Sequence, residues 1–207
     1  KIADAYTPVD RRTGRHVAHM DEIDFFSRQK RIVLKNCGQI DFDSLEAYVA
    51  HDGFRGLARA LGSLQPEQVI DEIRTAGLRG RGGGGFLTAL KWSLARKASG
   101  ESKYIICNAD EGDPGAFMDR SLLEGDPYAV IEGMTIGGYA IGASQGFLYV
   151  RAEYPLAIER ISRAIEQARK RGLLGQAILG SRFDFDLQVR IGAGAFVGSN
   201  STLVAPV

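Results

Sequence analysis

The glycine-rich segment 77–86, called the glycine loop below, is the part of the sequence best suited to bind a ligand. Six of the nine residues from Gly77 to Gly85 are glycine, and Arg81 and Lys91 place positive charge within and just after the run. Because glycine loses much backbone freedom on folding, such a cluster is typical of positive φ angles or of close approach between a ligand and bare backbone. Backbone N–H groups beside fixed positive charge suit a phosphate. The glycine loop therefore predicts a nucleotide-binding site.

Two common phosphate-binding motifs do not fit this loop. Gly80-x-Gly82-x-x-Gly85 matches the dinucleotide text pattern, but that pattern has meaning only between a strand and a helix. Here the preceding residues 71–76 have the pattern of an amphipathic helix end. A P-loop is excluded because Phe86 stands where its lysine should be. A flexible glycine linker is the other alternative, and the apolar helices predicted on both sides disfavour it.

A second polar cluster follows a predicted strand at 103–107 and contains Asn108, Asp110, Glu111 and Asp113. Ligands of open α/β sheets gather at the carboxyl ends of strands. Three carboxylates could bind a metal ion, although no histidine is near, and a solvated turn is the alternative, because Asp, Gly and Pro favour turns. The carboxylates could instead accept hydrogen bonds from ribose or ribityl hydroxyls, while the Asn108 amide offers both a donor and an acceptor.

Two further patterns are weaker. Phe86 and Trp92 could stack on a planar ligand, but aromatic side chains at such positions more often belong to a core. His16 and His19 have a spacing that suits a metal, yet two histidines alone are a poor ligand set. We therefore predict no metal site in this chain.

The composition indicates a globular protein. The chain has 207 residues with 44% hydrophobic and 25% charged residues, and its formal net charge of +1 disfavours a nucleic-acid-binding protein. No apolar stretch approaches the roughly 20 residues of a membrane span, and nothing resembles a secretory signal. Cys37 and Cys107 cannot form a disulfide framework or a four-cysteine metal site. These features favour a cytoplasmic setting, and the ends of the sequence suggest a fragment.

Hydrophobic periodicity predicts alternating helices and strands after a polar arm. A helix that begins at Asp43 has a break at Gly53, and the apolar run at 128–143 predicts a fully buried helix. The other expected helices lie at 66–76, 88–98 and 155–171, and the expected strands at 31–35, 103–107, 146–151 and 183–191. This order predicts an α/β layered domain at 66–207, preceded by an N-terminal arm and helical region at 1–65.

On these residues the sequence resembles the NADH-oxidising flavoprotein subunit of respiratory complex I and of related NAD-linked hydrogenases and formate dehydrogenases. The glycine loop with residues 90–92 resembles its first signature, residues 107–120 its second and residues 149–154 a third. The resemblance covers about residues 28–196, and residues 31–38 are closer to the hydrogenase and formate dehydrogenase branch.

The resemblance implies a three-layer, Rossmann-like but atypical flavin-binding domain, with FMN at the glycine loop and NADH stacked over it. Hydride would pass from NADH to the flavin, and electrons would leave to iron–sulfur partner subunits, including a thioredoxin-like 2Fe-2S subunit. Lys91 would stabilise negative charge and Phe86 would offer an aromatic face. The FMN contacts implied are Gly80, Arg81, Gly82, Gly83, Lys91, Asn108, Asp110 and Glu111, and the NADH contacts are Gly84, Gly85, Phe86 and Asp113.

From about residue 197 the sequence departs from the family pattern, because a cysteine and two glutamates expected there are absent. Ile191, Val197 and Leu203 instead recur every six residues, as in hexapeptide-repeat acyltransferases, but the repeat is too short for a solenoid. The four-cysteine motif of the family's 4Fe-4S domain is also absent from this sequence. A redox-inactive FMN-binding or assembly module of the same fold is therefore the main alternative.

Overall fold

The computed structural model describes residues 7–19, 22–82, 84–100 and 102–192, and the chain divides into two compact units, Lys1–Lys35 and Asn36–Val207. In the first unit, Val9 and His16 form an antiparallel bridge, and the short helix α2 spans Asp24–Ser27. The prediction of a strand at 31–35 is wrong, because this segment forms bends and turns. Its side chains lack the burial that stabilises a strand: Ile32 is 69% exposed.

The second unit carries the predicted alternation of helices and strands. Its elements are α3 (Leu45–Ala50), α4 (Arg55–Ser63), α5 (Pro66–Thr75), α6 (Thr88–Lys97), β1 (Tyr104–Ala109), α7 (Met118–Gly125), α8 (Pro127–Ile141), β2 (Gln145–Arg151), α9 (Pro155–Lys170), the 3-10 turn η2 (Ile178–Gly180) and β3 (Asp186–Gly192). Pro66 opens α5 and Gly77, with φ of +64°, follows its end, as the sequence predicts.

The three strands form a parallel sheet in the order β1-β2-β3. Parallel neighbours need long crossover connections, and α8 and α9 lie in the two crossovers. Ile105, Gly146 and Leu187 lie side by side in the register and are buried on one face of the sheet. On the other face, the rings of Tyr104 and Phe147 are in contact at 5.8 Å between centroids. The predicted α/β architecture is confirmed.

Helix α8 lies at the centre of this unit and is buried along most of its length, as its apolar sequence predicts. It contacts β1 and β2 of the sheet and also the helices α4, α5, α6, α7 and α9. Two glycines allow the close approach, because a Cβ on Gly137 would stand 2.4 Å from Ile105 and one on Gly138 would stand 2.6 Å from Phe185. The helix thus joins the sheet to the outer helices.

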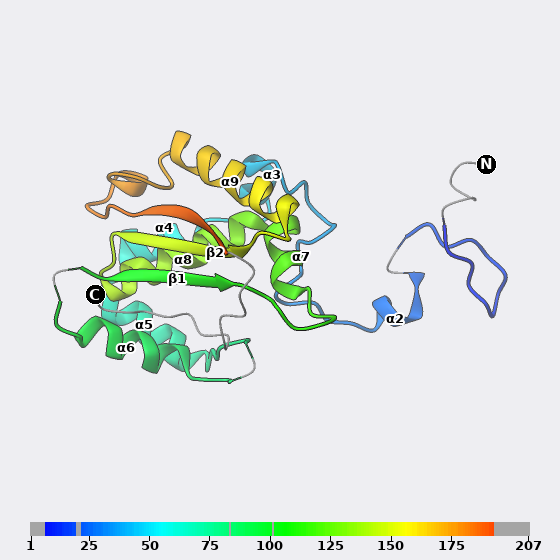
Figure 1. Ribbon diagram of the computed structural model, residues 1–207, viewed down its shortest axis with the longest axis horizontal. Helices are drawn as coiled ribbons and strands as arrows, with labels where there is room; N and C mark the ends of the chain where they lie inside the picture. The colour runs from blue at the N-terminus through cyan, green and yellow to red at the C-terminus, as the bar shows by residue number, and fades with distance from the viewer. Residues whose placement is uncertain (1–6, 20–21, 83, 101, 193–207) are drawn as a thin grey trace. The chain divides into compact units, whose positions relative to one another are not determined.

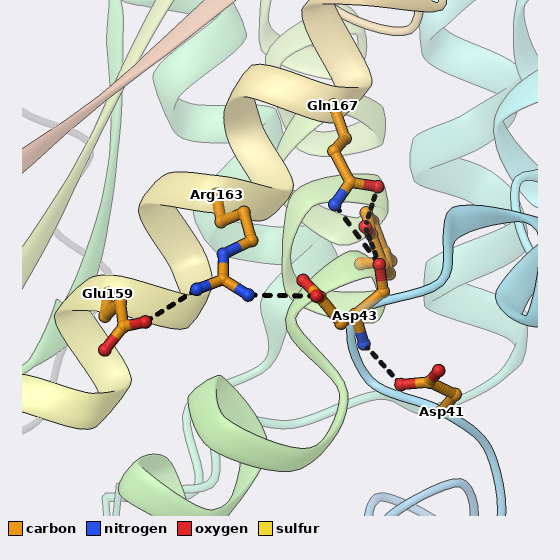
Figure 2. A network of polar contacts seen from close by, with 6 residues as sticks. Asp41, Asp43, Glu159, Arg163 and Gln167 are labelled. Carbon is orange, nitrogen blue, oxygen red and sulfur yellow. Dashed lines mark hydrogen bonds and ion pairs between the residues drawn. The ribbon is translucent and has the colours of Figure 1, made fainter.

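A polar network fastens the segment before α3 to α9 (Figure 2). Arg163 donates to the carboxylate of Asp43 at 2.9 Å, and Gln167 donates to its carbonyl at 3.2 Å. The helix start expected at Asp43 is displaced by one residue, because the Ser44 hydroxyl is the cap and accepts from the N–H of Ala47 at 3.0 Å. Residues 36–65, which the sequence groups with the N-terminal arm, lie in the second unit.

Candidate functional site

The glycine loop joins α5 to α6 and is closed at its base by hydrogen bonds. Gly80 N–H donates to the Phe86 carbonyl at 2.9 Å, and Thr88 N–H donates to the Leu78 carbonyl at 3.0 Å. Arg79 also donates to the Gly85 carbonyl at 3.0 Å, across the loop. These bonds argue against a flexible linker, because they fix where the loop leaves and rejoins the helices. They also engage the N–H of Gly80, one of the residues expected to contact FMN.

The tip of the loop presents backbone and few side chains. Gly85 has φ of +58°, a conformation that favours glycine, and a Cβ on Gly84 would meet no atom within 4 Å. Arg81 is exposed, and the Phe86 side chain is 50% exposed. Gly82 is half-buried, whereas Gly83 lies outside the described residues. The loop therefore offers open backbone next to an exposed cation and an exposed ring.

Helix α6 begins at Thr88, directly after the loop, with no side-chain cap. The first N–H groups of a helix carry a positive partial charge that favours an anion. Lys91 is half-buried in the first turn and adds a positive charge there. Trp92 belongs to the core, where it lies against Gly137. Phe86, the other aromatic side chain that could stack on a ligand, is exposed.

The second cluster follows β1, which extends to Ala109 and so includes Asn108. The Asn108 amide oxygen accepts from the N–H of Asp110 at 3.0 Å, a local turn at the strand end. The Asp110 side chain is only 6% exposed and lies 3.8 Å from Arg151. Asp113 is exposed, and its carbonyl accepts from Ala116. The acidic residues thus differ: Asp110 is buried and paired, and Asp113 faces outward.

Glu111 has a role that the sequence does not indicate. Its carboxylate accepts hydrogen bonds from the N–H groups of Met118 at 2.8 Å, Asp119 at 3.2 Å and Arg120 at 3.3 Å. These are the first three residues of α7, so Glu111 caps this helix from outside it. The helix α7 was not predicted from the sequence, because it has only eight residues and Phe117 at its N-cap position gives no capping signal.

Burial perturbs two groups near this cap. Burial raises the pKa of the Cys107 thiol to about 12, and the charge of Asp119 contributes to this shift. The raised pKa keeps the thiol neutral. Burial and the charge of Glu111 raise the pKa of Asp119 to about 6. Because the folded chain then holds this proton more tightly than the unfolded chain, the free energy of unfolding falls as pH rises from about 4 to about 6.

Replacing Asp119 by asparagine is therefore expected to remove that fall and to raise the free energy of unfolding at neutral pH. The gain should be on the order of 1 kcal/mol, because Asp119 is partly exposed and solvent screens its charge. Thermal unfolding midpoints at several pH values between about 4 and 7 would measure it. Asp113→Asn, exposed in the same segment, is the control and should leave the pH profile unchanged.

Arg151 and Tyr154, which lie within the third motif at 149–154, both contact the Asp110–Glu111 segment. Each donates to the Glu111 carbonyl, Arg151 at 2.9 Å and Tyr154 at 3.0 Å. The guanidinium groups of Arg120 and Arg151 both lie near the Tyr154 ring, at 5.5 and 5.8 Å from its centroid. The spacing of residues within a motif does not reveal the two bonds to the Glu111 carbonyl, because they join residues 40 and 43 positions apart.

The glycine loop and the segment after β1 lie at the same end of the second unit (Figure 1). Among the described residues, no group of three or more His, Cys, Asp or Glu side chains could hold a metal ion. None of the helices that the structure describes is long and apolar enough to cross a membrane. The candidate site thus consists of the exposed backbone and charged side chains of the glycine loop and of the polar residues that follow β1.

Comparison with known proteins identifies the family of this chain. A family model described as the Nuo51 FMN-binding domain matches residues 73–207. The NADP-reducing hydrogenase subunit HndC of Solidesulfovibrio fructosivorans is 54% identical over 175 residues, which is 84% of this chain and 35% of that protein. A subunit of the NADH-quinone oxidoreductase of Escherichia coli (strain K12) is 43% identical over 159 residues, 76% of this chain and 36% of that protein.

A solved NAD+-reducing [NiFe]-hydrogenase in the air-oxidized state has the same fold, with a TM-score of 0.59 and 32% sequence identity over 82% of this chain and 26% of the hydrogenase chain. The chain spans about a third of the length of the curated relatives it matches. The family match runs through the tail to residue 207, beyond the point where the sequence motifs depart. The chain belongs to the family of the Nuo51 FMN-binding domain.

Proposed function

We propose that this chain is the FMN- and NADH-binding portion of an NADH dehydrogenase flavoprotein subunit. In this function it accepts hydride from NADH onto FMN and passes electrons to iron–sulfur clusters of partner subunits, among them a thioredoxin-like 2Fe-2S subunit. The observation that carries the proposal is the family match over residues 73–207, a range that contains both the glycine loop and the acidic segment. The relatives named as subunits of hydrogenases and quinone oxidoreductases support a place in a multisubunit enzyme.

The chemistry of the donor set fits FMN. The phosphate requires N–H donors and positive charge, which the loop tip, Arg81, Lys91 and the start of α6 offer together. The open space at Gly84 leaves the backbone accessible to a ligand. We assign the FMN contacts to Gly80, Arg81, Gly82, Gly83, Lys91, Asn108, Asp110 and Glu111. Gly84, Gly85, Phe86 and Asp113 are assigned to NADH.

The protein residues hold and orient while the cofactor carries the redox chemistry. FMN, when bound, supplies an acceptor for two electrons from a nicotinamide and releases them one at a time. Lys91 stabilises negative charge close to the phosphate-binding backbone. The half-exposed ring of Phe86 gives an apolar surface for a planar group. Glu111, besides its assigned contact with FMN, holds the start of α7, because its carboxylate oxygens accept three N–H groups there.

Titration of the chain with FMN, followed by quenching of flavin fluorescence, tests the proposal. We expect saturable binding, and then loss of the visible flavin band when NADH is added without oxygen. NADPH is tested in parallel, because HndC is named as an NADP-reducing hydrogenase subunit. Binding without loss of the band would instead support the redox-inactive module, and absence of FMN binding would contradict the proposed site.

Gly80→Ala probes the backbone site without a large structural change. A Cβ there would lie 3.8 Å from the Phe86 carbonyl oxygen, which is ordinary van der Waals contact. We expect FMN to bind about tenfold more weakly, because the methyl group lies over backbone that must approach the ligand closely. Gly62→Ala on α4, where a Cβ would meet no atom within 4 Å, is the matched control and should bind FMN as the original chain does.

A further inference from the structure

We infer that Arg151 and Tyr154 are positioning residues, which fix the Asp110–Glu111 segment in the conformation that receives the flavin. The inference rests on the proposed function, because it concerns how the FMN-binding segment is held. It adds two residues that are not among the twelve site residues predicted from the sequence. Neither is required to touch FMN; they act through the peptide at Glu111.

The geometry at the Glu111 carbonyl carries the inference. The oxygen accepts from Arg151 Nη1 at 2.9 Å and from the Tyr154 hydroxyl at 3.0 Å. A carbonyl oxygen has two lone pairs, so these donors occupy its full capacity. Arg151 Nε also lies 3.8 Å from Asp110, and both side chains are largely buried, with 23% and 6% exposed. One guanidinium thus holds two successive residues of the segment.

Rigid elements supply both donors. Arg151 is the last residue of β2, and its neighbour Val150 is fully buried and pairs with Ala109 at the end of β1. Tyr154 immediately precedes α9. The two donors therefore reach from the adjacent strand and helix to the chain that leaves β1. Sites supported by such elements are placed more accurately than sites on unsupported loops.

The side chain of Glu111 fixes the segment from the other side. Its carboxylate holds three N–H groups at the start of α7, while its carbonyl holds the two donors described above. The adjacent turn, in which Asp110 N–H donates to the Asn108 amide, lies on the same short stretch. The orientations of Asn108 and Asp110, both assigned to FMN, therefore depend on where the Glu111 peptide is held.

Tyr154→Phe and Arg151→Lys remove this support with little change in volume, and the fold offers a matched control for each. Tyr139 also donates to a carbonyl, that of Leu64 at 2.7 Å, from α8 to the end of α4. Arg169 also bonds a carbonyl and an aspartate, Leu187 and Asp186, at β3. Tyr139→Phe and Arg169→Lys therefore lose bonds of the same kind elsewhere in the unit.

Three measurements on the 207-residue chain test the inference: the FMN dissociation constant, the thermal midpoint and the visible circular dichroism of bound FMN at saturation. We expect Tyr154→Phe to weaken FMN binding about fivefold and Arg151→Lys about tenfold or more, with an altered dichroism spectrum. The two controls should lower the thermal midpoint to a similar extent and leave the dissociation constant and the spectrum unchanged.

The outcomes separate this inference from the proposed function. If the original chain binds FMN and the variants match their controls in both affinity and spectrum, Arg151 and Tyr154 only stabilise the fold and the inference is wrong. If the original chain does not bind FMN, the proposed function fails and this inference fails with it. Hydrogen exchange at residues 110–119 without FMN adds a direct readout, and unchanged exchange in Tyr154→Phe would also overturn the inference.

Discussion

Replacing Glu132 by alanine is expected to lower the free energy of unfolding by about 3–5 kcal/mol. The carboxylate is buried on α8 and accepts hydrogen bonds from the Tyr48 hydroxyl at 2.6 Å, Phe54 N–H at 2.8 Å and Leu57 N–H at 3.1 Å. Removing it leaves three donors without their acceptor in a region from which water is excluded. The cost of an unsatisfied buried group exceeds the net gain of an ordinary hydrogen bond.

Glu132 is the cap of α4, supplied from another helix. Phe54 precedes α4 in the left-handed conformation, with φ of 59° and no side-chain cap of its own. The bonds from Phe54 and Leu57 to Glu132 therefore satisfy N–H groups at the start of this helix. Burial and the hydrogen bond to Glu132 raise the pKa of Tyr48, so its hydroxyl remains a donor. Loss of the carboxylate thus weakens the contact between α8 and the start of α4.

Urea unfolding monitored by circular dichroism measures the effect. Glu159→Ala is the matched control, because Glu159 is 60% exposed and its pair with Arg163 lies on the surface, so a change below about 1 kcal/mol is expected. If Glu132→Ala does not fold, Tyr48→Phe, which deletes one donor, should still cost about 1 kcal/mol. Equal effects of Glu132→Ala and Glu159→Ala would contradict the capping role.

The second large effect concerns two glycines of the same helix, for which opposite signs are expected. Gly138→Ala should destabilise the fold by about 2 kcal/mol, because its Cβ would stand 2.6 Å from the ring of Phe185, which is fully buried. Gly133→Ala should stabilise it by up to about 1 kcal/mol, because alanine favours a helix and a Cβ there meets no atom within 4 Å.

Thermal and urea unfolding of these two variants in parallel provide the comparison. Each substitution adds one methyl group to α8, so the difference between them isolates the contact with Phe185 from helix propensity. A stabilising Gly138→Ala would mean that the Phe185 ring moves aside at little cost. The close packing of α8 described above would then be wrong.

The elements were predictable wherever the signal is local and repeated. The apolar run of α8, the amphipathic pattern of α9 and the buried strands β1 and β2 each contain such a signal within their own residues. The alternation at 183–191 predicted a strand that in fact begins only at Asp186, and Ile191 is 60% exposed although it continues the pattern. The alternation of apolar residues alone does not determine which of them pair with a neighbouring strand.

The candidate site likewise has features with a local sequence signal and contacts that only the fold creates. The glycine loop was found because its composition is unusual within a few residues. The capping of α7 by Glu111 and the bonds from Arg151 join segments that only the fold brings together, so no local pattern contains them. The sequence therefore predicts Glu111 only as a cofactor contact, and the structure adds a second role, because its carboxylate accepts from the backbone of α7.

The position of α8 has a consequence for how the domain opens. Since this helix contacts two strands and five other helices, it cannot separate from its surroundings without disrupting nearly every layer, so its amides should exchange with solvent only through global unfolding. The glycine loop, by contrast, is held by only a few hydrogen bonds at its base, so we expect its amides to exchange through local opening. The molecule is thus expected to combine a cooperative centre with a candidate binding loop that opens at a lower free-energy cost.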